Sequence, residues 1–252
     1  MVGDIVEITP LKHNFGVIEK LYERKNKLIR PYVSNIDSLI IVIALLPKPD
    51  LTLVDKLIVS CYIEKIEPVL CFNKADLTDQ KSIDEVFEAY KNEMPCVRTS
   101  TVDSAIGLKE LYGVMKGKLS CFAGQSAVGK SSIINRIIGD EVMKVNGLSA
   151  KAQRGKHTTR HIEIFDYGEG RVVDTCGFSL LEIDKLKPEE LAYYYEDYVK
   201  LLSFCRYNNC VHINEPDCRV KEELAKGNLS VERYNRYVTI YNELKEKQND
   251  KY

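Results

Sequence analysis

The chain has 252 residues, of which 44% are hydrophobic, and its formal net charge at pH 7 is −1. This length accommodates one sizeable α/β domain with smaller attachments, and the apolar content is sufficient for a real core. The near-zero net charge excludes a polycation, so any contact with nucleic acid must come from local basic patches. No apolar run is long enough to span a membrane, and no signal peptide opens the sequence. Eight cysteines without a secretion signal indicate a reducing cytoplasm, with thiols or a metal site rather than disulfides.

The first 34 residues are expected to form a partial β segment and a basic linker. Val2–Ile8 alternates in the manner of a strand, and Phe15–Ile18 resembles a second strand. The positive charges of this segment suit RNA phosphates, but they are equally compatible with a solvated linker. They belong to Lys12, His13, Lys20, Arg24, Lys25, Lys27 and Arg30.

Residues 38–76 are interpreted as strand, helix and strand, followed by a polar motif. Ser38–Leu45 is a continuous apolar run rich in β-branched residues, which is typical of a buried parallel strand. The next apolar residues recur on one helical face, with Asp50 as the expected N-cap. A second buried strand, Pro68–Phe72, then leads directly into Asn73-Lys74-Ala75-Asp76.

This tetrapeptide has the N-K-x-D pattern of guanine recognition. Guanine carries donors at N1 and N2 that one carboxylate accepts, whereas adenine presents an acceptor at N1. Asp76 would be left unpaired against adenine, and a stranded polar group rejects the wrong ligand strongly. Asn73 would hold the motif, and the stem of Lys74 would lie along the purine ring. The pattern is weak alone and gains weight from the strand end and from a phosphate loop further along the chain.

The segment between the motif and the phosphate loop is expected to contain a helix over residues 80–92 and a short strand at Cys96–Thr99. Ser100 follows this strand where GTPases present a backbone N–H to guanine O6, although the sequence match there is poor. A helix over residues 108–115 and a buried strand at Lys118–Ala123 are expected next.

Residues 124–132 have the pattern G-x-x-x-x-G-K-S of a phosphate-binding loop. Glycine lets the backbone curl round an anion, and the dipole of the following helix adds positive potential. Lys130 would reach the β- and γ-phosphates, and the Ser131 hydroxyl would ligate Mg²⁺. Gly139 is expected to end the helix. The expected nucleotide contacts are Gly124, Gln125, Ser126, Ala127, Val128, Gly129, Lys130, Ser131 and Ser132.

Two further motifs follow the loop helix. Residues 151–160 are polar and irregular, as in a first switch whose threonine, here Thr159, ligates Mg²⁺ only while the γ-phosphate is present. Two short apolar segments, expected to pair as strands, then end in the D-T-x-G sequence of residues 174–177. Asp174 suits an outer-sphere contact to Mg²⁺, and the N–H of Gly177 suits the γ-phosphate.

Residues 205–218 contain three cysteines and one histidine in the spacing C-x₄-C-x-H-x₅-C. Three thiolates and an imidazole form the closed tetrahedral set that structural Zn²⁺ prefers, and the neighbouring residues are too polar for core cysteines. The spacing is not that of a common zinc finger, so the pattern favours zinc without requiring it. Helices are expected on both sides, at Pro188–Leu202 and Glu222–Lys247. The expected ligands are Cys205, Cys210, His212 and Cys218; Cys61, Cys71, Cys96 and Cys121 are expected to be merely buried.

The order of the motifs predicts a circular permutation, because an ordinary GTPase has N-K-x-D last and this chain has it first. On these motifs, on Gly155–Thr159, on Asp174–Phe178 and on the cysteine cluster, residues 2–245 resemble the circularly permuted, ribosome small subunit-dependent GTPases, the RsgA type. The resemblance implies a cytoplasmic GTPase that binds GTP and GDP and acts in late maturation of the 30S ribosomal subunit. It also implies contact with 16S rRNA, stimulation by the subunit, and one structural Zn²⁺ with Mg²⁺ accompanying GTP. We expect a monomer with no membrane partner.

The expected fold class is α/β, with residues 35–180 as a circularly permuted P-loop GTPase domain. Residues 1–34 are expected to be a partial N-terminal OB-like β segment and linker, and residues 181–252 a helical zinc-binding domain. Cys176 stands where the family usually has proline, a change that a small thiol should tolerate. The family's OB-fold has five strands, whereas this chain starts near the last two, so the barrel is expected to be incomplete or the chain truncated.

The expected mechanism is a switch in which GTP orders Thr159 and Gly177 and hydrolysis releases them. The chain runs from Gly177 straight into the zinc segment, which suggests a covalent link between the second switch and that segment. Phe178 occupies the position of the usual water-orienting glutamine, and the resemblance makes His157 the candidate substitute; His157 as an ordinary exposed loop residue is the alternative. Lys130 and Thr159 complete the expected catalytic set.

Three rival functions are compatible with parts of the sequence. An ATP-dependent P-loop enzyme is one, and Asp76 argues against it. An RNA-binding protein that holds GTP as a structural cofactor is the second. A permuted GTPase of the large ribosomal subunit is the third, and the cysteine cluster is the wrong attachment for that group.

Overall fold

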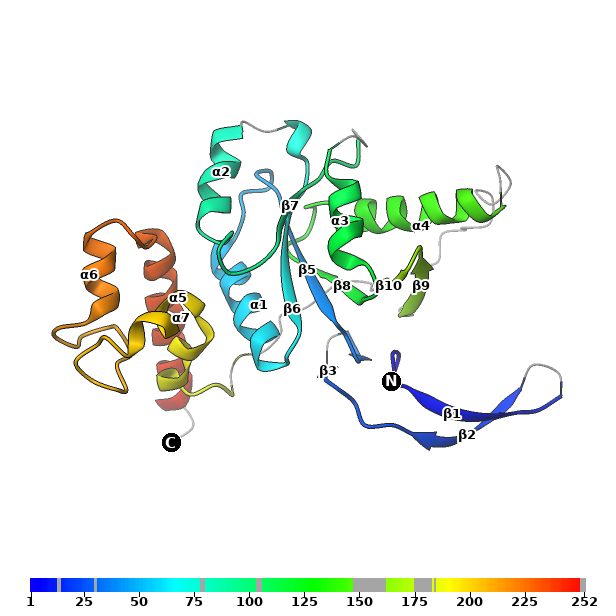
Figure 1. Cartoon of the computed structure of the whole chain (residues 1–252), viewed down its shortest axis with the longest axis horizontal. Helices are drawn as coiled ribbons and strands as arrows, with labels where there is room; N and C mark the ends of the chain where they lie inside the picture. Colours follow the sequence, from blue (N-terminus) through cyan, green and yellow to red (C-terminus); the bar gives the residue numbers. More distant parts are fainter. Residues whose placement is uncertain are drawn as a thin grey trace.

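The computed structural model describes residues 1–12, 15–29, 31–77, 80–102, 106–146, 162–174, 183 and 185–249. Its centre is a six-stranded sheet in the order β7-β6-β5-β8-β10-β9 (Figure 1). Every neighbouring pair is parallel except β9 and β10, which run antiparallel. The α/β class predicted from the sequence is therefore confirmed. The strands are β5 (Ser38–Ile43), β6 (Glu67–Phe72), β7 (Cys96–Arg98), β8 (Leu119–Ala123), β9 (Glu163–Tyr167) and β10 (Gly170–Asp174).

Helices cover both faces of this sheet, which explains why its central strands are mostly apolar. All six residues of β5 are buried, and they alternate between two cores. Leu39 and Ile41 join the core that contains α1, whereas Ile40 and Val42 join the core that contains α3 and α4. The helices are α1 (Leu51–Ile63), α2 (Gln80–Glu88), α3 (Leu108–Met115) and α4 (Lys130–Asn146).

The ends of these helices test two sequence predictions. Asp50 caps α1 as expected, because its Oδ1 accepts the backbone N–H of Leu53 at 3.0 Å. The prediction that Gly139 ends α4 is wrong, since the helix continues to Asn146. A glycine inside a helix costs only about 1 kcal/mol relative to alanine. The buried isoleucines of the first turns hold the helix against the sheet, and this packing outweighs that cost.

The N-terminal segment forms two small antiparallel sheets. The first of them, the hairpin of β1 and β2, confirms the two expected strands at slightly shifted positions. Figure 1 shows the hairpin of β1 and β2 extending away from the central sheet. Its residues are largely exposed. Two cations of the basic linker are paired inside the chain, Arg24 with Asp4 at 2.7 Å and Lys25 with Asp37 at 2.9 Å. The strands are β1 (Val6–Pro10), β2 (Gly16–Leu21), β3 (Lys27–Leu28) and β4 (Val33–Ser34).

The C-terminal segment is helical, but each of its two predicted helices is divided. Tyr195 is extended (φ −111°, ψ 100°) and interrupts the first, because its buried ring stacks on Tyr198 with the ring centroids 5.1 Å apart. Gly227 (φ +76°) follows the end of α6 (Arg219–Ala225), where it terminates the helix. The hydroxyl of Ser230 accepts the N–H of Arg233 at the start of α7 (Val231–Asn249). The elements are the 3₁₀ helix η3 (Pro188–Tyr194), α5 (Glu196–Leu202), α6 (Arg219–Ala225) and α7 (Val231–Asn249).

Among the described residues, no helix combines the length and the apolar character needed to cross a membrane. Cys61, Cys71 and Cys121 are buried and Cys96 is half-buried. Burial raises the pKa of the Cys71 and Cys121 thiols to about 12, so these residues behave as the inert core cysteines that the sequence predicted.

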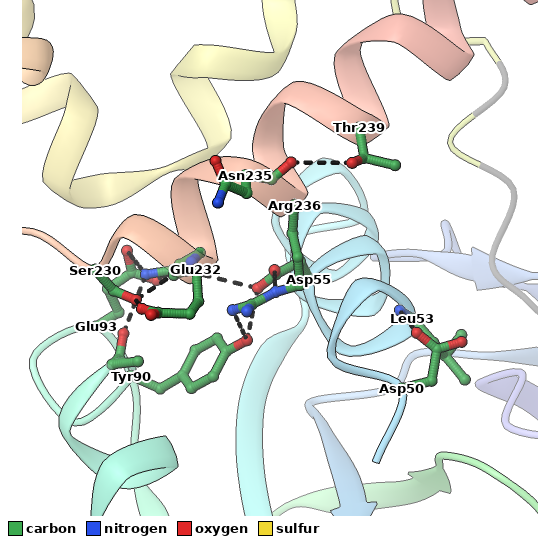
Figure 2. A network of polar contacts seen from close by, with 12 residues as sticks. Asp50, Leu53, Asp55, Tyr90, Glu93, Ser230, Glu232, Asn235, Arg236 and Thr239 are labelled. Atoms are coloured by element: carbon green, nitrogen blue, oxygen red, sulfur yellow. Dashed lines mark hydrogen bonds and ion pairs between the residues drawn. The ribbon is translucent and has the colours of Figure 1, made fainter. Parts of the chain in front are cut away.

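A buried ionic network joins α7 to the sheet unit. The side chains of Arg233, Asp55 and Glu93 are 7%, 0% and 1% exposed. Both terminal nitrogens of Arg233 donate to the Glu93 carboxylate, at 2.7 and 2.6 Å. Figure 2 shows the second half of the network, in which Arg236 donates to Asp55 at 2.5 Å and to the hydroxyl of Tyr90 at 2.9 Å. Two cations and two carboxylates thus neutralise one another in a space that excludes water.

The network fixes the C-terminal helices to α1 and to the turn after α2. Burial alone would lower the pKa of Arg233, but its bonds to Glu93 outweigh that effect and the pKa is raised. Breaking one partner of a desolvated pair is costly because the other charge stays buried without compensation.

Arg233→Ala should therefore lower the free energy of unfolding by about 3–5 kcal/mol, the range for removing one partner of a buried ion pair. Urea unfolding followed by circular dichroism measures this quantity. The matched control is Lys200→Ala, which breaks the exposed pair between Lys200 and Glu196 on one helix and should cost less than about 0.5 kcal/mol. Equal losses in the two variants would contradict the assignment of the network as the main tie.

Candidate functional site

The phosphate loop lies between β8 and α4, as its sequence predicted. Gly124 and Gly129 have φ of +124° and +98°, which disfavour any residue with a side chain. A Cβ on Gly124 would lie 2.1 Å from the carbonyl oxygen of Val42 in β5. The loop therefore packs directly on the backbone of the neighbouring strand, and glycine is required for that approach.

Lys130 begins α4 and reaches back over the loop. Its Nζ donates to the carbonyls of Gly124 at 2.7 Å and Gln125 at 2.5 Å. Burial lowers the pKa of this ammonium, and the helix N-terminus adds positive potential beside it. Ser131 and Ser132 follow in the first turn with exposed side chains. A cation, a helix N-terminus and two hydroxyls thus stand together, which is the chemistry that a polyphosphate requires.

The N-K-x-D motif is bonded to this loop although it lies more than fifty residues earlier in the chain. Asn73 is buried, and its Nδ2 donates to the carbonyl of Val128 at 2.9 Å. A Cβ on Gly129 would lie 2.2 Å from the same nitrogen, so this glycine is required by the contact. Lys74 donates to the carbonyl of Ala127 at 2.8 Å. The two motifs form one site.

Asp76, the last residue of the motif, is exposed, whereas the nearby Ser100 is buried. Ala75 and Asp76 lie in the short 3₁₀ helix η1 (Ala75–Leu77), where the Asp76 side chain is exposed. Ser100 is buried, its N–H donates to the carbonyl of Ile106 at 3.2 Å, and its hydroxyl accepts the N–H of Val102. In this structure the backbone N–H of Ser100 is therefore already bonded to the carbonyl of Ile106.

Two positioning contacts were not found from the sequence. The hydroxyl of Thr99 donates to Oδ1 of Asn73 at 3.2 Å, and its carbonyl accepts the N–H of Ala75 at 3.1 Å. Oε1 of Gln125 accepts the backbone N–H of Asp50 at 2.9 Å, which ties the phosphate loop to the start of α1. Both contacts join residues that are distant in sequence, and neither motif specifies Thr99 or the side chain at position 125, so no local signal could have indicated them.

The remaining predicted nucleotide residues are placed only in part. Asp174 ends β10, which runs parallel to β8, so its backbone lies at the same sheet edge as the phosphate loop. In open α/β sheets ligands bind at the carboxyl ends of the strands. The predictions for His157, Thr159, Gly177 and Phe178, and for the side chain of Asp174, lie outside the described residues.

The four predicted metal ligands converge at one point. One ligand atom from each of them lies within 4.8 Å of all the others, and three of the four residues are buried. Nδ1 of His212 is 3.3 Å from Sγ of Cys218 and 3.7 Å from Sγ of Cys205, so this ring nitrogen faces the thiols. We call residues 205–218 the Cys/His loop.

The Cys/His loop is held in shape from two directions. On α7, the hydroxyls of Tyr234 and Tyr237 donate to the carbonyls of His212 and Val211, each at 2.7 Å. Within the loop, the carboxylate of Glu215 accepts three backbone N–H groups at 2.8–3.0 Å. These bonds fix the positions from which the ligands project.

The donor set suits a structural zinc ion. Three sulfurs and one imidazole, with no carboxylate among them, form the closed set that Zn²⁺ prefers. Burial lowers the pKa of His212 to about 4, which keeps the imidazole neutral and able to ligate. Burial raises the pKa of Cys210 to about 12, so its thiol ionises only when a cation replaces the proton. The residues therefore fit the metal.

Comparison with known proteins agrees with this geometry. The family model described as RsgA GTPase matches residues 21–184. The protein of Alkaliphilus metalliredigens named small ribosomal subunit biogenesis GTPase RsgA is 44% identical over 250 residues, which cover 97% of this chain and 85% of that one. Its namesake in Caldanaerobacter subterraneus subsp. tengcongensis is 42% identical over 257 residues, 100% of this chain and 86% of that one.

Two crystal structures share the fold of this chain over nearly all of its length. That of YjeQ from Thermotoga maritima has a TM-score of 0.82 at 36% identity, covering 96% of this chain and 84% of that one. That of YloQ, described as a circularly permuted GTPase, has a TM-score of 0.82 at 31% identity, covering 98% and 81%. With N-K-x-D ahead of a phosphate loop to which it is bonded, and with a family match over most of its length, the chain belongs to the RsgA GTPase family.

Proposed function

We propose that this protein hydrolyses GTP as a molecular switch in late maturation of the 30S ribosomal subunit, where it binds 16S rRNA and is stimulated by the subunit. The bonding of Asn73 and Lys74 to the backbone of the phosphate loop is the observation that carries the proposal, because it unites base recognition and phosphate binding. Relatives that are about 40% identical over the full chain bear the name small ribosomal subunit biogenesis GTPase. The protein is proposed to be a cytoplasmic monomer.

Base recognition is assigned to Asp76, which is exposed beside the anchored motif. Its carboxylate accepts the N1 and N2 donors of guanine, and the stem of Lys74 lies along the ring. Adenine would leave the carboxylate unpaired, which excludes ATP as the preferred nucleotide. Ser100, two residues after the end of β7, is assigned to the edge of the base.

Phosphate binding is assigned to residues 124–132, with the Lys130 ammonium exchanging its two loop carbonyls for the β- and γ-phosphates. Ser131, Thr159 and Asp174 would hold Mg²⁺, which supplies positive charge between the β- and γ-phosphates when bound. Gly177 contributes its N–H to the γ-phosphate. Because Phe178 cannot orient water, His157 is assigned that role on the subunit.

The three parts of the chain are proposed to divide this work at residues 34/35 and 180/181. Residues 35–180 bind and hydrolyse the nucleotide. Residues 181–252, shaped by zinc, and the basic N-terminal segment meet the ribosome. Arg24 and Lys25 are paired with aspartates, so the N-terminal segment has less positive charge left for RNA phosphates. We therefore assign more of the contact with the ribosome to the C-terminal part.

Asp76→Asn should weaken GTP binding by about tenfold or more, since a carboxylate that pairs two donors is lost. Binding of xanthosine triphosphate should improve, because the C2 carbonyl of xanthine prefers the donor that asparagine supplies. Competition against a fluorescent nucleotide measures both affinities. Glu85→Gln, which makes the same charge change on an exposed position of α2, should leave both unchanged. An unaltered preference for GTP in Asp76→Asn would remove this residue from the base site.

His157→Ala should lower the turnover stimulated by 30S subunits by about 100-fold or more, the effect of losing a group that assists proton transfer. GTP affinity should stay close to that of the wild type, because a group used only in the transition state does not alter ground-state binding. Phosphate release is measured with 30S subunits, with 50S subunits and with neither. Thr159→Ala should also lose stimulation.

The same assay tests the proposed function. Stimulation by 30S but not by 50S subunits is expected in the wild type. Equal turnover under all three conditions would favour the rival in which GTP is a structural cofactor of an RNA-binding protein. Wild-type rates in His157→Ala on 30S subunits would show that the histidine is not involved.

Elemental analysis should find about one zinc per chain in protein purified without chelator. Cys210→Ala should lose most of the metal and lower the melting temperature, because the ligand loop closes round the ion. Cys96→Ser removes a half-buried cysteine outside the cluster and should retain full zinc. A wild-type protein that carries no metal, or a Cys210→Ala variant that keeps it, would refute the site.

A further inference from the structure

A hollow of about 500 Å³ lies between the Cys/His loop and α7. This volume is within the range of small-molecule sites. The loop side contributes Tyr207, Asn209 and Asn214, and the helix side contributes Tyr241, Asn242 and Lys245. None of these six residues belongs to the nucleotide site or to the metal ligands, so the hollow requires its own explanation.

The two walls are held at a fixed separation. Tyr234 and Tyr237 of α7 bond the carbonyls of His212 and Val211, so helix and loop are tied together directly beside the hollow. Glu215, which also lines it, uses its carboxylate oxygens for three backbone N–H groups of the loop. The hollow is therefore pre-formed, and binding there would cost little ordering of the chain.

The chemistry of the lining is aromatic, amide-rich and only weakly charged. Tyr207 is 42% exposed, with the guanidinium of Arg206 at 5.7 Å from its ring centroid. Three side-chain amides offer both donors and acceptors. Lys245 supplies a cation, and no ion pair to it is found among the described residues. A flat ring with a hydrogen-bonding edge and a single adjacent phosphate matches this set of groups.

An unstacked base of single-stranded RNA has these properties, whereas a duplex does not. RNA duplexes are recognised through rows of phosphates and 2′-hydroxyls over a wide surface, and one lysine is too little charge for that. Single strands are held by stacking on tyrosine and by hydrogen bonds to exposed base edges. The lining favours this second mode.

We propose that the hollow binds one unstacked nucleobase of single-stranded RNA. The rings of Tyr207 and Tyr241 provide the stacking surfaces, the amide of Asn242 reads the base edge, and Lys245 meets the neighbouring phosphate. The proposal rests on the proposed function, since the 30S subunit is where such a protein meets single-stranded rRNA. It adds the chemical class that the C-terminal part recognises.

The test uses the zinc-loaded full chain and short labelled oligoribonucleotides: homopolymers of each of the four bases and one duplex, followed by fluorescence anisotropy. Tyr207→Ala should weaken single-strand binding by about fivefold or more, the effect of losing one stacking partner. Tyr207→Phe keeps the ring and should bind as the wild type does. Asn242→Ala should alter the order of preference among the four homopolymers.

Tyr193→Ala is the matched control, because Tyr193 is 53% exposed on η3 and does not line the hollow. It should bind RNA normally. Zinc content and melting temperature of each variant show that the fold is intact. Tyr207 and Asn242 are exposed, so their substitution should not disturb either quantity.

Two results would overturn the proposal. One is wild-type affinity for every single strand in both Tyr207→Ala and Asn242→Ala. The other is a loss of 30S binding in these variants with unchanged oligoribonucleotide binding, which would mean that the hollow receives a ribosomal protein.

Hydrolysis with and without 30S subunits separates this proposal from the proposed function. If 30S subunits fail to stimulate the wild type while Tyr207→Ala still weakens single-strand binding, the switch function is refuted and the base pocket stands. If stimulation is normal and RNA binding ignores Tyr207 and Asn242, the pocket alone is refuted.

Discussion

The site depends on one contact, the hydrogen bond from the Asn73 amide to the backbone of the phosphate loop at Val128. It joins two motifs that the chain presents far apart, and Gly129 must lack a side chain for it to form. Thr99 supports the amide from its other side. Because the contact joins the ends of two strands of one sheet, β6 and β8, which lie on either side of β5, it does not depend on which motif the chain makes first. A permuted order therefore leaves the chemistry intact.

The buried pairs of Arg233 and Arg236 define how the C-terminal helices relate to this site. They attach α7 to α1 and to the turn that follows α2. The sequence suggested a different link, in which the chain after Gly177 connects the second switch to the zinc segment. The described contacts show a second connection, made by buried ion pairs between residues that are far apart in the sequence.

The fold was predictable wherever a pattern was local. Continuous apolar runs bounded by polar motifs predicted β5, β6 and β8, and spacing and residue type indicated the four cysteine and histidine residues that the structure brings together. The breaks at Tyr195 and Gly227 were missed because burial of a tyrosine and a left-handed turn interrupt otherwise helical periodicity. The ionic network was invisible because Arg233 and Glu93 are 140 residues apart. In the sequence, a buried charged residue on a helix cannot be told from a solvent-exposed one until its partner is known.

These contacts form a continuous structural path from the phosphate loop to the Cys/His loop. Gln125 bonds the backbone at Asp50, Asp50 caps α1, and Asp55 one turn further on binds Arg236 of α7. From α7, the hydroxyls of Tyr234 and Tyr237 donate to two carbonyls of the Cys/His loop. Every link is a hydrogen bond, an ion pair or a stretch of helix. The path connects the phosphate loop to the Cys/His loop through α1 and α7, so a surface that engages both must match the spacing seen in this structure.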